Sequence, residues 1–279
     1  KKENLAILSA SRKFKFYKAD IRNKAALAKI FRKEKPEYVV HLAAKTGVPA
    51  SLLKPHEYEA VNIGGTINLL ELSKDTKVKK FIFISSSSVY GNTPTKPPFK
   101  ESEVTDFPLS LYAATKKAGE LICHCYFHNF GLSVTCVRFF NVYGERMRPN
   151  VVLSYWVEHI LKGQPIELGT EFRRRDFTYV GDVAEGLVKI LKKAEGYNIF
   201  NIANSNPASL SELLAIVEEA CGKKVPVGKR KNNRASIKVS HGDITKARKI
   251  LGWKPKTSLK RGVSKYVAWF KQNRLKNYS

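Results

Sequence analysis

Tyr112 and Lys116 are two residues whose types and spacing could do chemistry together. They are four positions apart in a stretch that predicts a helix over residues 110–130, so their side chains should share one face. An ammonium group beside a phenol favours the phenolate, and the tyrosine could then take up a proton near neutral pH. Such a spacing also arises by chance in a chain with 12 tyrosines and 50 lysines and arginines, so its surroundings must decide.

Polar residues follow the predicted strands on both sides of this helix. A strand over 80–85 runs into four consecutive serines, residues 85–88, and a strand over 133–139 runs into Asn141. The carboxyl ends of parallel strands meet at one edge of an open α/β sheet, where ligands bind. We therefore expect the serines, Tyr112, Lys116 and Asn141 to meet in one site.

The order of elements predicts the sheet that would position these residues. Strands alternate with helices, which favours an α/β fold with a doubly wound, mainly parallel, Rossmann-like sheet. After residue 141 the alternation loosens and short strands mix with helices. The expected strands are 14–19, 37–43, 80–85, 133–139 and 197–203, and the expected helices are 22–34, 56–74, 110–130, 150–162, 181–194, 209–221, 243–251 and 258–274.

Length and composition indicate a globular chain. Its 279 residues can bury a large core, and its hydrophobic content of 43% is ordinary for a soluble protein. No apolar run is long enough to predict a membrane span. The four cysteines form no Cys-x-x-Cys pair and indicate reduced thiols in a cytoplasmic protein.

The net charge of +26 raises nucleic-acid binding as an alternative. The lysines are spread along the chain in short groups, which favours a solvated basic surface instead, and no nucleic-acid-binding motif is present. A positive cleft would also attract dianionic small molecules. His124 and His128 share a helix face, but a metal would need two more ligands from elsewhere, so no metal site is expected.

Several further motifs occur in an order that resembles one family. With these motifs the chain resembles the extended short-chain dehydrogenases/reductases, the NAD-dependent epimerase/dehydratase family, and is most similar to UDP-glucuronate and UDP-glucose 4-epimerases. The motifs are His-Leu-Ala-Ala at 41–44, Val-Asn-Ile-Gly-Gly-Thr at 61–66, the stretch 108–118 around Tyr112, Arg-Asp-Phe-Thr-Tyr-Val at 175–180, and the closing stretch 243–255.

The resemblance implies two domains and a dimer. Residues 1–145 would form an NAD-binding Rossmann domain that lacks its first strands. Residues 146–279 would form a smaller α/β substrate lobe, with the chain crossing back to the sheet around 180–205. Helices 56–74 and 110–130 would pair with a second copy, so the resemblance implies a homodimer.

It also implies roles for individual residues. Tyr112 would be the base, Ser86 a relay hydroxyl, and Lys116 would tune Tyr112 and hold the nicotinamide ribose. The implied contacts to NAD are Asp20, Ile21, Leu42, Ala43, Ala44, Asn62, Tyr112, Lys116 and Phe139. The implied contacts to a UDP-sugar are Ser87, Ser88, Asn141, Arg148, which would lie near a uronate carboxylate, and Arg175, which would meet the diphosphate.

One family motif is missing from the printed chain. The glycine-rich turn Gly-x-x-Gly-x-x-Gly brings the backbone close to the cofactor pyrophosphate, and here the first glycine is Gly47. The chain starts at Lys1, and its only methionine is Met147. Comparison with the family motif indicates that roughly 45 residues are absent, and we favour a fragment over a true loss. The printed chain alone should then bind NAD weakly.

Three other functions remain open at this level. Asn141 stands where uronate epimerases usually carry threonine, and the loop 145–148 is closer to UDP-glucuronate decarboxylases. Nucleotide-sugar dehydratases are the second alternative, although they usually carry an Asp-Glu pair within the serine run. A basic binding protein without catalysis is the third.

Overall fold

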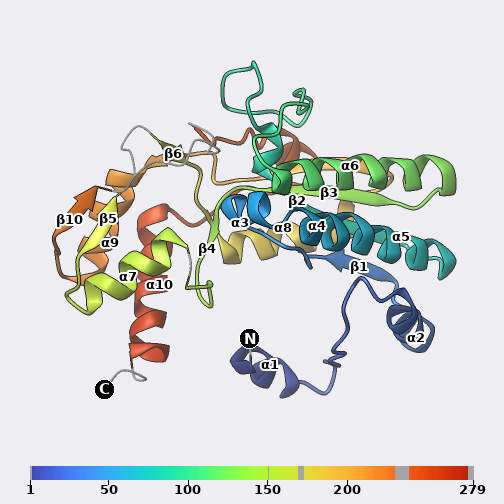
Figure 1. Ribbon diagram of the computed structural model, residues 1–279, viewed down its shortest axis with the longest axis horizontal. Coiled ribbons are helices and arrows are strands. Elements are labelled where there is room, and N and C mark those ends of the chain that lie inside the picture. Colours follow the sequence, from blue (N-terminus) through green and yellow to red (C-terminus); the bar gives the residue numbers. More distant parts are fainter. Residues whose placement is uncertain (1, 150, 169–172, 230–238, 276–279) are drawn as a thin grey trace.

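A four-stranded parallel sheet forms the centre of the molecule, as predicted. The computed structural model describes residues 2–149, 151–168, 173–229 and 239–275. The strands β1 (Tyr38–His41), β2 (Lys80–Ser86), β3 (Val134–Phe139) and β8 (Tyr197–Ile202) lie in the order β1-β2-β3-β8 (Figure 1). Every neighbouring pair is parallel, so the carboxyl ends of β2 and β3 meet at one edge.

The two central strands, β2 and β3, are buried on both faces, which explains why their sequences are mostly apolar. Successive side chains of β2 alternate between the faces. Phe81 and Phe83 contribute to one core, whereas Ile82 and Ile84 contribute to the other.

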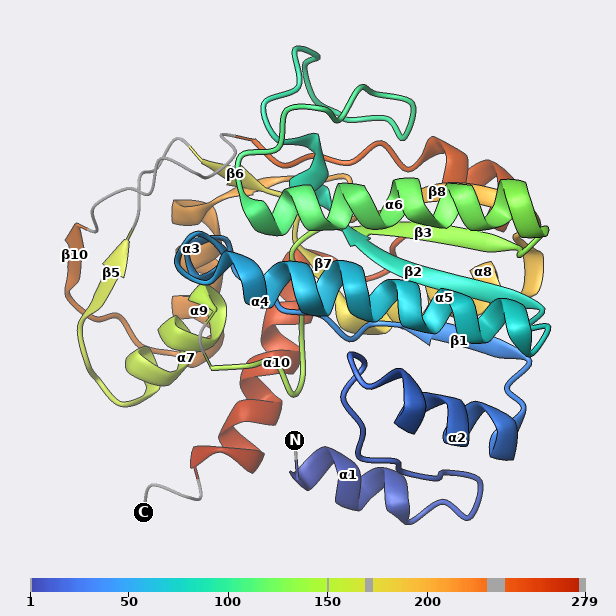
Figure 2. The ribbon, with the colours of Figure 1, turned by 45° about the vertical axis from the view of Figure 1, so that its right-hand side comes forward.

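Helices cover the two faces separately. α2 (Lys24–Glu34), α5 (Gly65–Asp75) and α6 (Leu111–Phe130) contribute side chains to the first core, and α5 and α6 run side by side over the sheet (Figure 2). α8 (Val180–Lys193) and the π-turn η3 (Ala247–Leu251) contribute to the second. The doubly wound arrangement is therefore confirmed.

The predicted helix 56–74 is interrupted at its centre. It consists of α4 (Pro55–Glu59), the π-turn η1 (Ala60–Gly64) and α5. A π-turn inserts an extra residue per turn and often marks a functional site. A further short helix, α3 (Val48–Leu53), precedes it where no helix was expected.

The strand predicted over 14–19 is wrong. The chain there is irregular and follows α1 (Lys2–Ser9). Within the part of the chain that the structure describes, β1 is the last strand on this side of the sheet. An extended segment without a partner strand cannot satisfy its backbone groups in a ladder. A side-chain contact attaches this segment to α2 instead. Lys15 Nζ lies 2.7 Å from Oε2 of Glu34.

A second group of elements packs beside the sheet. α7 (Val152–Leu161), α9 (Leu210–Cys221) and α10 (Leu259–Asn273) share a core with Trp156, Leu213 and Tyr266 at its centre. Three short strand pairs complete it: β5 (Ile166–Leu168) with β10 (Val227–Lys229), β4 (Val142–Tyr143) with β7 (Thr178–Tyr179), and β6 (Arg174–Arg175) with β9 (Ala208–Ser209).

The helices expected over 150–162, 209–221 and 258–274 are confirmed within one or two residues at each end. The helix expected over 243–251 is shorter and consists mainly of η3. The domain limits at 145 and 146 remain a prediction.

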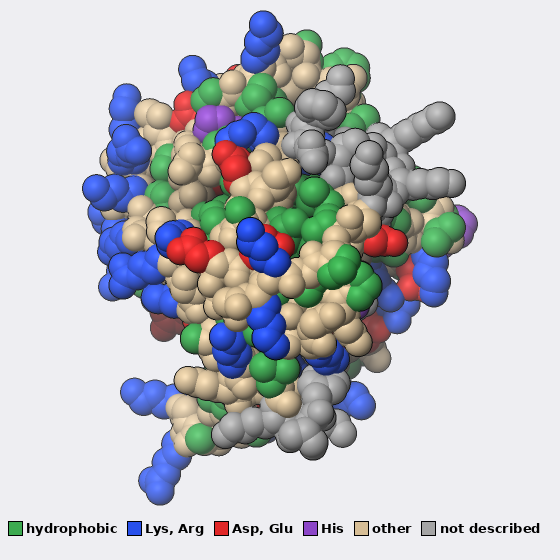
Figure 3. Space-filling model, turned by 90° about the vertical axis from the view of Figure 1, so that its left-hand side faces the viewer, with side chains coloured by type: hydrophobic (Ala, Val, Ile, Leu, Met, Phe, Trp, Pro, Cys, Tyr) green, Lys and Arg blue, Asp and Glu red, His purple; other side chains and the backbone are tan. Residues whose placement is uncertain are grey.

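Lysine and arginine side chains stand at several separate places on the face shown in Figure 3, with acidic side chains between some of them.

Candidate active site

A cavity of about 570 Å³ opens at the carboxyl ends of β2 and β3. Its other walls include the first two turns of α6, the segment that follows β1, the loop before α7 and the start of α7. Ten of the residues singled out in the sequence line it: Leu42, Ala44, Ser86, Ser87, Ser88, Tyr112, Lys116, Phe139, Asn141 and Arg148. The expectation that the serines, Tyr112, Lys116 and Asn141 meet in one place is therefore confirmed.

Ser86 and Tyr112 are brought together by the ends of two regular elements. Ser86 is the last residue of β2, and its Oγ accepts a hydrogen bond of 3.1 Å from the Ser88 backbone N–H. That bond starts a 3₁₀ turn, η2 (Ser87–Tyr90), which turns the next serines along the cavity wall. Ser110 caps α6 by accepting from Ala113 N–H at 3.1 Å, so Tyr112 lies in the first helical turn. The Ser86 side chain lies close enough to the Tyr112 hydroxyl to lower its pKa, and both residues line the cavity.

Lys116 lies one turn further along α6 and is buried. Its Nζ donates to the Ile84 carbonyl oxygen at 2.7 Å and lies 5.0 Å from the centre of the Phe83 ring. Burial lowers the pKa of Lys116 to about 8. Below that pH the ammonium is still present, at the bottom of the cavity.

The pKa of Tyr112 differs from the sequence-based expectation. Burial raises it, while the Ser86 hydrogen bond and the charge of Arg148 lower it to a smaller extent. Lys116 does not stabilise the phenolate as expected, because its ammonium donates to a backbone carbonyl instead of approaching the phenol oxygen. The four-residue spacing placed both groups on one face but did not decide where the ammonium would bind.

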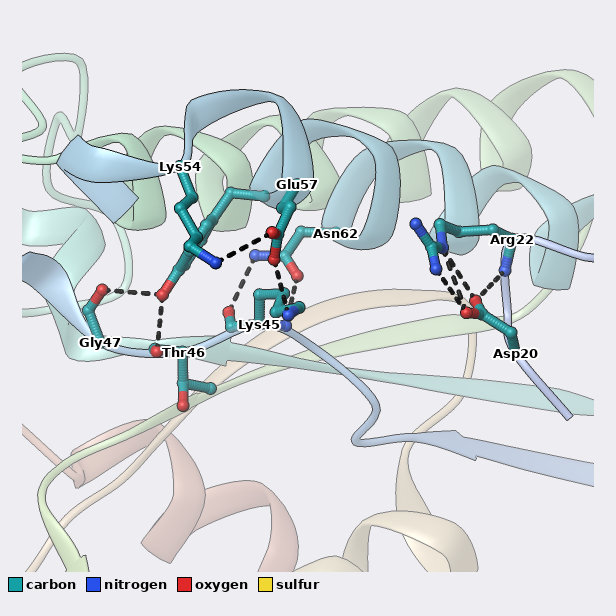
Figure 4. A network of polar contacts seen from close by, with 9 residues as sticks. Asp20, Arg22, Lys45, Thr46, Gly47, Lys54, Glu57 and Asn62 are labelled. Carbon is teal, nitrogen blue, oxygen red and sulfur yellow. Dashed lines mark hydrogen bonds and ion pairs between the residues drawn. The ribbon is translucent and has the colours of Figure 1, made fainter. Parts of the chain in front are cut away.

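A second tyrosine packs against Tyr112. Tyr58 of α4 is buried, its hydroxyl lies 2.7 Å from the Thr46 carbonyl oxygen and 3.0 Å from that of Gly47, and its ring meets Tyr112 edge-on at 6.5 Å. The contacts to Thr46 and Gly47 are visible in Figure 4. No sequence pattern connects these segments, so sequence reasoning missed Tyr58, Thr46 and Gly47.

Arg148 reaches the cavity from the loop before α7. Its Nη1 donates to Thr46 Oγ1 at 2.6 Å, which joins this loop to the segment that follows β1. Its charge acts on Tyr112 and on Tyr58. The guanidinium is therefore available at the cavity wall for an anionic group.

Asn141 follows β3 at the cavity wall and has a left-handed backbone, with φ 24°. Asparagine adopts such a conformation more readily than most residues because its short amide can bond locally. Its carbonyl accepts from Thr178 N–H at 3.3 Å, next to the β4–β7 pair. This bond holds the Asn141 backbone at the carboxyl edge of the sheet.

A neighbouring hollow of about 590 Å³ contains the other end of the predicted cofactor site. Asp20, Ile21, Ala43 and Ala44 line it, together with Arg22. Arg22 holds the Asp20 carboxylate, with Nη2 and Oδ2 at 2.7 Å (Figure 4), and lowers the pKa of Asp20 to about 2. Ala44 lines both hollows, so they adjoin.

Two predicted contact residues lie outside the hollows. Asn62, in the π-turn, is buried: its Oδ1 accepts from Lys45 N–H at 2.8 Å, and its Nδ2 donates to Thr115 Oγ1 at 3.0 Å (Figure 4 shows the Lys45 side). It therefore ties the segment after Ala44 to α6. Arg175 lies in β6, where its Nη1 donates to the Arg174 carbonyl oxygen at 2.9 Å. Burial, and then the charge of Arg173, lower its pKa to about 10.

The described residues contain no group of three or more metal-ligating side chains. The His124 and His128 rings stack at 6.3 Å on the surface of α6, and His124 meets Tyr197 edge-on at 4.9 Å. No helix in the described ranges is long and apolar enough to span a membrane.

The chain is similar to nucleotide-sugar enzymes along nearly its whole length. The family model described as GDP-mannose 4,6 dehydratase matches residues 1–266. UDP-glucuronate 4-epimerase of Thermodesulfobacterium geofontis is 42% identical over 268 residues, which cover 95% of this chain and 82% of that protein.

Two solved structures superpose closely. UDP-glucuronic acid 4-epimerase of Bacillus cereus, in complex with UDP-glucuronic acid and NAD, is 34% identical with a TM-score of 0.90, covering 97% of this chain and 85% of that one. UDP-glucose 4-epimerase of Thermotoga maritima, with UDP-glucose, is 31% identical with a TM-score of 0.90, covering 94% and 86%. With its parallel sheet and its Ser-Tyr-Lys site, this chain belongs to the GDP-mannose 4,6-dehydratase family, within the NAD-dependent epimerases and dehydratases of the extended short-chain dehydrogenase/reductase type.

Proposed function

We propose that this chain is an NAD-dependent enzyme that inverts the fourth carbon of a UDP-sugar through a transient 4-keto intermediate, with UDP-glucuronate as the leading substrate. The observation that carries the proposal is the convergence of Ser86, Tyr112 and Lys116 in one cavity that also exposes the Arg148 guanidinium. The named relatives support the reaction class.

Tyr112, as the phenolate, would take the proton from the 4-hydroxyl group, and Ser86, which lies beside it in the cavity, would pass that proton between sugar and phenol. The hydride that leaves the fourth carbon needs an acceptor, and NAD supplies this when bound. Once the flat ketone has turned over, the hydride would return to the opposite face of the fourth carbon, and Tyr112 would return the proton to the oxygen. The net reaction is then an isomerisation without net oxidation.

The residues present fit the two ends of NAD. Leu42, Ala44 and Phe139 provide apolar walls next to Lys116, whose buried ammonium can donate to ribose hydroxyls. Asp20 and Ile21 line the adjoining hollow, and the small side chains of Ala43 and Ala44 leave the strand end between the hollows open. A dinucleotide with two separate ends suits this pair of hollows. No residue of the printed chain is assigned to the pyrophosphate.

Arg148 is the proposed partner of the uronate carboxylate. A guanidinium binds a carboxylate through two parallel hydrogen bonds, which suits a charged sixth carbon better than a neutral hydroxymethyl group. Ser87, Ser88 and Asn141 line the same cavity and are proposed to contact the sugar. Arg175 remains a proposed contact to the diphosphate, although it does not line the cavity in the structure.

The chain is further proposed to form a homodimer through α5 and α6. Support comes from apolar side chains on these helices that are exposed to solvent, including Ile67, Leu121 and Phe130. Light scattering of wild type and Leu121→Glu tests this, since the charge should convert dimers to monomers.

A location in the cytoplasm is proposed because all four cysteines are free thiols.

The decisive assay uses the full-length protein as its gene encodes it, with NAD and UDP-glucuronate, UDP-glucose or their N-acetyl relatives, read by product NMR. We expect UDP-galacturonate from UDP-glucuronate, with Tyr112→Phe as the control. A pentose product would indicate a decarboxylase, and a 4-keto-6-deoxy sugar would indicate a dehydratase. No product from any of the sugars would refute the proposal and favour a binding protein.

A further inference from the structure

Three residues on one stripe of α6 face the end of the central sheet. Tyr112, Lys116 and Glu120 follow one another at intervals of four, so they point in nearly the same direction. Lys116 donates to the Ile84 carbonyl oxygen at 2.7 Å. Glu120 Oε1 accepts from Ser85 Oγ at 2.6 Å. Two consecutive residues at the end of β2 therefore each hold one residue of the helix, and the next, Ser86, lines the cavity with Tyr112.

Glu120 is also joined to β3 by a buried ion pair. Arg138 Nε donates to Glu120 Oε1 at 2.9 Å, and Nη2 donates to Oε2 at 2.8 Å, so the contact is bidentate. The two side chains are only 2% and 1% exposed. Arg138 is the register partner of Ser85, so the carboxylate contacts β2 and β3 at the same level of the sheet.

The remaining contacts of Arg138 leave it little freedom. Its guanidinium lies 4.9 Å from the centre of the Tyr90 ring, and Nη1 donates to the Glu101 carbonyl oxygen at 3.3 Å. The planar group is thus fixed on one face and at its edges. Because Glu120 binds this fixed guanidinium, α6 has one favourable position relative to the sheet.

A buried ion pair is a poor source of stability, because removing two charges from water offsets most of their attraction. Well-packed apolar side chains hold a fold equally well, but they permit small shifts that a bidentate contact resists. The contact lies two helical turns from Tyr112 on the same rigid helix, about 12 Å along its axis. Its clearest physical effect is therefore on the position of the helix.

We propose that Glu120 and Arg138 are positioning residues for Tyr112 and Lys116. The pair, with Ser85, sets how far α6 is rotated and advanced over the sheet edge, and so where the phenol stands relative to Ser86. The inference rests on the proposed function of Tyr112, and it goes beyond the residues that touch substrate or cofactor.

The test replaces both charges by apolar side chains of similar size, Glu120→Leu with Arg138→Met, in the full-length protein. We expect a folded protein with a melting temperature near that of wild type, because no charge is left unpaired. Turnover at saturating UDP-glucuronate should fall roughly 10-fold or more, since small misplacements of a reacting group are costly, while KM changes less than about twofold. Arg138→Lys, which keeps the charge but not the two-point contact, should be intermediate.

Asp182→Asn is the matched control. Asp182 is a carboxylate with 5% exposure in α8, and it accepts from Lys256 N–H at 3.2 Å and Thr257 N–H at 3.0 Å, outside the cavity lining. This variant should lose stability but keep its turnover. A folded double variant with wild-type turnover would overturn the proposal, as would an equal loss of turnover in Asp182→Asn.

A readout without substrate separates this inference from the proposed function. In protein with ¹³C-labelled tyrosine rings, the Tyr112 signal is identified by its absence from Tyr112→Phe. It should move in the double variant and stay in place in Asp182→Asn. If the wild-type protein shows no epimerase activity, the Tyr112 signal alone tests the positioning role. An unchanged signal in the double variant would then overturn that role. If the double variant does not fold, Glu120→Gln, which removes the charge and keeps the volume, is measured instead by the same criteria.

Discussion

The residues proposed for the chemistry and those proposed to grip the substrate are built in different ways. Ser86, Tyr112 and Lys116 lie at the end of β2 and on α6, where Ser86 and Lys116 are buried and each is held by the sheet or by its neighbours. Arg148 lies in the irregular chain before α7, is exposed, and touches Thr46. Arg175 lies in a two-residue strand of the other group of elements.

The side chains proposed to react are thus fixed by regular elements, whereas Arg148, proposed for recognition, lies in a loop, where the sequence can vary. A proton transfer requires a defined geometry, which strands and helices supply. Loops tolerate substitution without disturbing the core, so substrate preference can change there at little cost in stability. Removing residues of each kind should therefore give different losses.

The largest expected loss comes from Tyr112→Phe. Removing one positioned acid–base group should lower turnover roughly 100-fold or more, while affinity for NAD stays near that of wild type. Steady-state kinetics and calorimetric titration with NAD measure the two quantities. A variant with near-normal turnover would mean that another residue is the base.

The burial of Lys116 should appear as a pH dependence of stability. Its pKa is about 8 in the folded protein and near 10.5 when exposed, so between these values the unfolded chain binds more protons. Stability should therefore rise with pH in this window, by up to about 2 kcal/mol between about pH 8 and 9.5 relative to Lys116→Met. Urea unfolding at both pH values measures this difference.

Arg148→Ala serves as the control from the loop region. A guanidinium stays charged throughout this range, so Arg148→Ala should follow the slope of wild type. Equal slopes for wild type and Lys116→Met would contradict the assigned burial of the lysine charge.

Arg148→Ala should affect one substrate more than the other. Losing a charge-assisted contact should raise KM for UDP-glucuronate about tenfold and leave UDP-glucose nearly unchanged. Arg148→Lys, which keeps the charge but not the two-point geometry, should recover part of the loss. Equal effects on both sugars would remove Arg148 from the carboxylate site.

Arg175→Ala should have the smallest effect. Because Arg175 does not line the cavity, we expect about a twofold rise in KM, with the same factor for both sugars. Parallel kinetics of Arg175→Ala and Arg148→Ala compare the two arginines directly. A larger loss for Arg175→Ala would show that β6 moves toward the diphosphate when substrate binds.

The parallel sheet, its covering helices and the residues proposed to react could be predicted from the sequence, because these follow from local rules. The continuous apolar run of β2 predicts a strand buried on both faces, and a spacing of four places Tyr112 and Lys116 on one helix face. Hydroxyl and amide residues after parallel strands then meet at one edge. The family motifs in the sequence further predicted NAD as the cofactor and UDP-sugars as the substrate class.

The contacts between segments that are distant in the chain became visible only in the folded molecule. It showed that residues 14–19 lack a partner strand, that Asn62 holds a backbone segment, and that the Lys116 ammonium binds the Ile84 carbonyl instead of the phenol. It also brought Tyr58 and Arg148 to the segment after β1. A side chain's partner depends on how whole elements pack, and neither spacing nor composition records that arrangement.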